Sequence, residues 1–175
     1  MKDRPASTIA EKMIKVDHAG ENGAVNIYRA QLMIARVRSR HLIHQLDHNM
    51  RHEMEHRQIF RNHLSSSAIR RCRSYLACGI GGFALGLVTG CIGPSAIAAT
   101  TYAVEKAVLE HLEIQLSYLK DEDEAAYRCV IRIVDDEKAH HDAAVAQLQA
   151  DKMLTRVLVR IVRFSTEQVI RYGMR

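Results

Sequence analysis

Residues 53–56 read Glu-Met-Glu-His, and residues 137–140 read Glu-Lys-Ala-His. Residues three apart lie on one face of a helix, so each Glu-x-x-His pattern can aim a carboxylate and an imidazole at one point. A further glutamate, Glu21 or Glu105, stands 32 residues before each pattern, and the two halves repeat with an offset of 84 residues. This repeated spacing predicts two helical hairpins of the same design.

Charged clusters lie midway between each glutamate and its partner pattern. They are centred near residues 37 and 121, between apolar periodic stretches, and charged clusters in such places favour turns. Each arm of a hairpin is then about 16 residues, or about 24 Å of helix. We therefore expect hairpins over about residues 7–64 and 95–149, with all four helices carrying ligands at one level of the bundle.

Six side chains are predicted to meet at that level, and they are Glu21, Glu53, His56, Glu105, Glu137 and His140. One glutamate from each of two helices and a Glu-x-x-His pattern from each of two others is the pattern of ferritin-like two-metal sites. Four carboxylates balance two divalent cations, whereas they would repel one another if buried without metal. Oxygen ligands with one nitrogen per metal suit iron or manganese. Asp136 is expected to accept a hydrogen bond from the free imidazole N–H of a ligand histidine on the facing helix.

Composition agrees with an all-α chain that forms a single domain over residues 1–175. The sequence is 47% hydrophobic and has only two prolines, which favours helices and allows a sizeable core. The other histidines are interpreted as solvated, although His44, His48 and His52 have the i, i+4 spacing of an adventitious zinc site. Tyr28, on the face of Glu21, is interpreted as core packing. Glu55 and Glu110 lack symmetric mates and are interpreted as surface residues.

Residues 74–104 carry no charge, and this segment is long enough to span a bilayer. Its glycines and the Gly93-Pro94 pair instead predict two helices, with an apolar connection over residues 74–94. Residues 152–172 predict a basic amphipathic helix. We interpret it as packing on the bundle with a solvated arginine face, and a helix lying on a membrane surface is the alternative.

The net charge of +5, with 25 lysines and arginines, favours a polyanion or a membrane surface as partner. Nucleic acid is not expected, because the arginines are spread over several elements and there is no aromatic stacking platform. The four cysteines form no regular framework, which is typical of reduced residues in a cytosol-facing protein. No secretory or transit signal is visible in the sequence.

The whole pattern resembles the demethoxyubiquinone hydroxylase family of ubiquinone biosynthesis. The resemblance rests on DHAGENGA at residues 17–24, the Glu53–His56 pattern, GFALG at 82–86, AVE at 103–105 and DEKAHHD at 136–142. It runs in this order over roughly residues 14–172. The chain departs from the family at Lys106, where many members have a second acid, and in a helix around Glu53 that is unusually rich in histidine and arginine.

The resemblance implies a ferritin-like monooxygenase with two iron ions that hydroxylates the quinone ring of demethoxyubiquinone with dioxygen. It further implies a peripheral membrane protein, on the cytoplasmic face of a bacterial inner membrane or the matrix face of the mitochondrial inner membrane. NADH or another donor would supply electrons at an unknown site. An accessory lipid-binding protein and a homo-oligomer are compatible with it. The alternative is a ferritin-like iron-handling or peroxide-scavenging protein without an organic substrate.

Overall fold

The predicted all-α fold is confirmed. The computed structural model describes residues 3–148 and 153–174, and within them it has no named strand, only an isolated bridge between Arg4 and Ile69. The α-helices are α1 (Ile9–Arg38), α2 (Ile43–Ser66), α3 (Tyr75–Ile92), α4 (Pro94–Glu122), α5 (Glu124–Ile131), α6 (Val134–Gln147) and α7 (Met153–Gly173). The predicted segment ends at residues 149 and 152 lie outside the described residues.

Helices α1 and α2 form the first predicted hairpin. A capping box starts α1: the Thr8 side chain accepts a hydrogen bond from the Glu11 N–H, and the Glu11 side chain accepts one from the Thr8 N–H. The chain leaves α1 at Ser39 and passes through a short 3-10 helix, Arg40–Leu42, into α2. The turn predicted near residue 37 therefore falls two residues later.

The second hairpin differs from the prediction in its second arm. Gly93, at φ 121°, ends α3, and Pro94 begins α4 as the sequence predicted. The turn expected near residue 121 lies at Asp123, whose side chain caps α5. The expected single helix after it is two helices, α5 and α6, separated at residues 132–133. This break places three acidic residues, including Glu137, in the first turn of α6, where the helix dipole favours negative charge.

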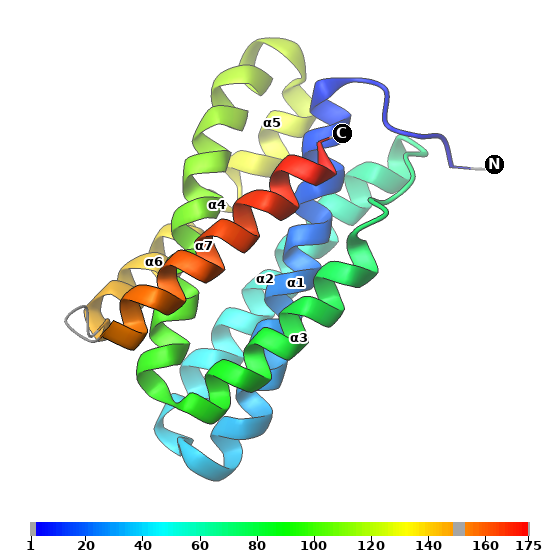
Figure 1. Ribbon diagram of the computed structural model, residues 1–175. Coiled ribbons are helices and arrows are strands. Elements are labelled where there is room, and N and C mark those ends of the chain that lie inside the picture. Colours follow the sequence, from blue (N-terminus) through cyan, green and yellow to red (C-terminus); the bar gives the residue numbers. More distant parts are fainter. Residues whose placement is uncertain (1–2, 149–152, 175) are drawn as a thin grey trace.

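Helix α3 lies against α1, and α7 packs across α4 and α1 on the same side of the bundle (Figure 1). The close contact with α1 depends on glycines of α3, because a Cβ added at Gly82 or Gly86 would overlap the α1 backbone. Two apolar clusters form the core, one around Phe60 and Leu119 and the other around Leu32 and Leu46. Along the helices, the six predicted ligands lie between these two clusters.

Candidate metal centre

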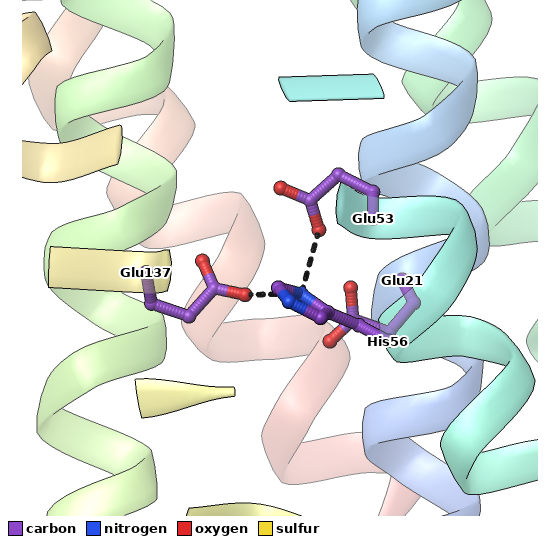
Figure 2. Close-up of side chains that lie close together, drawn as sticks. All are labelled: Glu21, Glu53, His56 and Glu137. Carbon is purple, nitrogen blue, oxygen red and sulfur yellow. Dashed lines mark ion pairs between the residues drawn. The ribbon is translucent and has the colours of Figure 1, made fainter. Parts of the chain in front are cut away.

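The structure brings all six predicted ligands together inside the bundle. Each is 6% exposed or less, and they come from α1 (Glu21), α2 (Glu53 and His56), α4 (Glu105) and α6 (Glu137 and His140). Their ligand atoms form two groups of four, in each of which all atoms lie within 4.8 Å of one another. One group is Glu21, Glu53, His56 and Glu137, drawn in Figure 2, and the other is Glu53, Glu105, Glu137 and His140.

Glu53 and Glu137 belong to both groups, so the cluster has the form of two adjacent cation sites with two shared carboxylates. Each histidine reaches across to the glutamate of the facing helix. His56 Nδ1 lies 3.0 Å from Glu137 Oε1, and His140 Nδ1 lies 3.2 Å from Glu53 Oε1 (Figure 2 shows the first). Both imidazoles therefore aim the same nitrogen atom at the shared carboxylates.

Protons balance the negative charge of this cluster when metal is absent. Burial raises the pKa of Glu21 and Glu105 well above the ordinary value, and the neighbouring carboxylates of Glu53 and Glu137 raise it further. Burial by itself would lower the pKa of His56, but its contacts with Glu137 and Glu53 outweigh burial and raise it to about 11. The same two carboxylates raise the pKa of His140 to about 9.

Several buried carboxylate oxygens and imidazole nitrogens of the cluster lack hydrogen-bond partners, and divalent cations could take the place of such partners. Glu53 Oε1, Glu137 Oε2 and the Nδ1 atoms of both histidines are buried without a hydrogen-bond partner, although ion-pair distances separate them. Such orphaned buried atoms are costly unless a ligand satisfies them. Four carboxylate side chains and two imidazoles match the charge of two dications and suit iron or manganese. The cluster could therefore hold metal, and iron is compatible with its chemistry.

Residues around the cluster fix the orientation of its members. Asp136 Oδ2 lies 3.1 Å from His56 Nε2, the ring nitrogen that faces away from the cluster. The Asp136 side chain is 44% exposed, so it reaches His56 from the edge of the bundle. Tyr28 was expected only to pack in the core, yet its hydroxyl donates a 3.0 Å hydrogen bond to Glu105 Oε1. The seven-residue spacing from Glu21 to Tyr28 was the available signal.

The residues interpreted as surface positions lie outside the cluster. Glu55 is exposed, and Glu110 pairs with Arg163 at 2.7 Å. His44 and His48 are exposed on α2, whereas His52 is half-buried beside His140, with 5.3 Å between the ring centroids.

A cavity of about 450 Å³ opens onto the cluster. It is lined mainly by apolar side chains of α1, α3, α4 and α7, and all four glutamates of the cluster lie along it. The side chains of Ser74, Ser165 and Thr166 also line it. So do Asp17 and His111, and Gln115 donates to both carboxylate oxygens of Asp17 at 2.9 and 3.0 Å. Sequence reasoning missed this cavity and the role of these two residues in it. Asp17 precedes Glu21 by one helical turn, which was the only local signal.

Comparisons with known proteins show which family the chain belongs to. The family described as "Ubiquinone biosynthesis protein COQ7" matches residues 8–173. The chain belongs to this family. Among its curated relatives are "NADPH-dependent 3-demethoxyubiquinone 3-hydroxylase, mitochondrial" of Dictyostelium discoideum, 32% identical over 157 residues (84% of this chain and 71% of the relative), and the human protein of the same name, 29% identical over 145 residues (80% and 65%).

A bacterial relative is similar to the same extent. It is the "3-demethoxyubiquinol 3-hydroxylase" of Delftia acidovorans, 33% identical over 134 residues (75% of this chain and 63% of the relative). The chain thus spans about two thirds of the length of the relatives that it matches, between 63% and 71% in these three.

In this COQ7 family member the helices beside the cavity carry exposed apolar side chains. On α7 these are Leu154, Val157, Ile161 and Phe164, and on α3 they are Leu76, Ile80, Val88 and Ile92. Helix α7 packs on α4 and α1 with Val162 buried, but a second apolar stripe faces outward. Packing on the bundle with a solvated arginine face therefore accounts for only part of its apolar surface. Among the described helices, α3 alone is long and apolar enough to cross a membrane, with a mean hydropathy of 1.8.

Proposed function

We propose that this chain hydroxylates the ring of 3-demethoxyubiquinone, or of its quinol, in ubiquinone biosynthesis, with two iron ions held by the six clustered ligands. Family membership and the names of the relatives support the reaction. The observation that carries the proposal is the apolar cavity that ends on the buried carboxylates. An iron-handling protein without an organic substrate needs no such cavity, so that alternative is not favoured.

The carboxylates and imidazoles would bind the two ions in a fixed arrangement. Glu53 and Glu137 would be shared, while Glu21 with His56 and Glu105 with His140 would complete the two separate sites. Asp136 would orient His56 through its Nε2 atom, as partners of ligand histidines commonly do, and Tyr28 would orient Glu105. When bound, the iron ions supply the binding and reduction of dioxygen.

The cavity would receive the quinone ring. Its volume of about 450 Å³ lies within the range of roughly 300–1,000 Å³ that is usual for small-molecule sites. Apolar walls exclude water from the ring, and Asp17 and His111 lie in the cavity wall, where they can exchange hydrogen bonds with its oxygen atoms. Burial raises the pKa of Asp17 to about 7 despite the opposing hydrogen bond from Gln115, so near neutral pH this carboxyl can either donate or accept a proton.

The isoprenoid tail would leave the cavity between α3 and α7 and enter one leaflet of a membrane. The exposed apolar side chains of both helices support this geometry, since they flank the cavity that Ile161 and Leu85 help to line. Arg70, Arg71 and Arg73 precede α3 and would contact anionic headgroups. We propose peripheral attachment at the face of a bacterial or mitochondrial inner membrane, and a nicotinamide nucleotide as the source of electrons.

Activity of the purified full chain tests this proposal. The chain is supplied with ferrous iron, dioxygen, a reductant and a short-tailed demethoxyquinone, and iron content and hydroxylated product are measured together. Wild type and the surface control Glu55→Ala should bind two irons and form product, whereas Glu137→Ala should lose iron and product. Iron-loaded wild-type chain that forms no product would refute the reaction. Two irons retained in Glu137→Ala would refute the ligand assignment.

A further inference from the structure

A stripe of histidines on α2 leads from the protein surface to the buried cluster, on the side away from the cavity. His44, His48, His52 and His56 are each four residues apart, so the stripe winds around the helix as it descends. His44 and His48 are exposed, the side chain of His52 is 24% exposed, and that of His56 is 2% exposed. None of these histidines lines the apolar cavity.

The contacts along this stripe are continuous from His48 inward. The rings of His48 and His52 lie 4.2 Å apart between centroids, and the rings of His52 and His140 lie 5.3 Å apart. Asp136 connects the stripe to the other ligand histidine, because its Oδ1 lies 3.6 Å from His52 Nδ1 and its Oδ2 lies 3.1 Å from His56 Nε2. The stripe thus touches both imidazoles of the cluster from outside.

His52 and Asp136 also have the separation of two ligands of one cation. His52 Nδ1 is buried and makes no hydrogen bond. Ligand atoms that each lie about 2.0–2.2 Å from one ion are themselves about 3–4 Å apart, and the 3.6 Å between His52 Nδ1 and Asp136 Oδ1 falls in that interval. His48 adds a second imidazole at i, i+4 spacing, the arrangement in which two helical histidines share a metal.

A buried centre for two dications needs a path along which the ions can enter. The apolar cavity is a costly path, because an ion would shed water there with few polar groups to replace it. Along the histidine stripe, an entering ion can replace its bound water molecules one at a time by imidazole and carboxylate ligands.

We propose that His48, His52 and Asp136 form a surface site that captures divalent iron and passes it to the buried cluster. This inference rests on the proposed metal centre. It also assigns a role to His48 and His52, which belong neither to the six predicted ligands nor to the lining of the cavity.

The rate of iron uptake tests this inference. Metal-free full chain is mixed with ferrous iron without oxygen, a chelator stops uptake at set times, and bound iron is counted. His48→Gln should slow uptake about tenfold, the lower end of what loss of an outer partner costs in metal affinity, while the final content stays at two irons. His52→Gln should act likewise. His44→Gln, one turn further out on the same stripe, is the matched control and should load at the wild-type rate.

The possible outcomes are distinguishable. His48 contacts no proposed ligand of the cluster, so a wild-type uptake rate in His48→Gln overturns the capture site even if the proposed function is correct. If His44→Gln slows uptake to the same extent, the capture site is also overturned, because the slowing would then follow from the loss of any surface histidine on α2. Wild-type chain that binds no iron overturns the proposed centre and this inference together.

Discussion

Replacing Gly82 by alanine should push α3 away from α1 and destabilise the bundle. A Cβ at Gly82 would overlap the carbonyl oxygen of Gly23 and lie 2.9 Å from its carbonyl carbon and 3.1 Å from its Cα. Carbon atoms in good contact are about 3.5–4.0 Å apart, so the two helices would have to separate by at least about 0.6 Å. Because the clashing atoms belong to the backbone, no side-chain rotation can relieve the overlap.

The neighbouring glycine provides the control. A Cβ at Gly81 meets nothing within 4 Å, and the residue is exposed on the same helix. Gly81→Ala should therefore stabilise the chain by about 0.5–1 kcal/mol, the ordinary gain of alanine over glycine in a helix. Gly82→Ala has the same helical gain, but its clash with backbone atoms should cost the upper part of the usual overpacking range, about 2–3 kcal/mol. Its net effect should therefore be a loss of about 1–2.5 kcal/mol.

Urea unfolding of the metal-free chains, followed by far-ultraviolet circular dichroism, measures both changes at a common denaturant slope. The metal state must be the same, because bound metal adds its own stabilisation. Two adjacent substitutions of the same kind should thus change the free energy of unfolding in opposite directions. A Gly82→Ala chain as stable as wild type, or equal losses at both positions, would refute the proposed close packing of α3 on α1.

Three further predictions concern single side chains. Burial raises the pKa of Asp17 to about 7 despite the hydrogen bond from Gln115, so the folded chain keeps a proton that the unfolded chain releases above about pH 4. The free energy of unfolding should therefore decrease as the pH rises from about 4 to about 7. Asp17→Asn should reduce that fall, by roughly 4 kcal/mol at most, in urea unfolding across pH, and an unchanged pH dependence would contradict the assignment. Thr8→Ala should cost about 1 kcal/mol of unfolding free energy by removing the cap of α1, and Thr8→Ser should restore it. Tyr28→Phe should weaken metal binding by roughly tenfold in competition titrations, because Glu105 loses its hydrogen bond. An unchanged metal affinity would show that Tyr28 only packs in the core.

The common level of the six predicted ligands was predictable because a helix has a fixed rise per residue. A glutamate and its partner pattern 32 residues apart must lie at one level if a turn lies midway, and the turns at Ser39 and Asp123 are within two residues of the expected places. The break between α5 and α6 was not predictable. Ile133 at the break is fully buried and the acidic first turn of α6 follows it, but the local sequence has no glycine or proline there to indicate an interruption.

What the sequence by itself determined is the set of six predicted ligands, their spacing and the two hairpins that carry them, since each follows from local residue order and helical geometry. Only the tertiary structure decided where the apolar cavity lies, that Asp17 and His111 line it, and that His52 lies between the surface and the cluster. The physical reason is that the spacing of apolar or polar residues along a helix identifies its apolar or polar face, but not its neighbours. What covers that face depends on how distant helices pack: α7 leaves part of its apolar stripe beside α3 exposed, and α2 carries its histidines to the edge of α6.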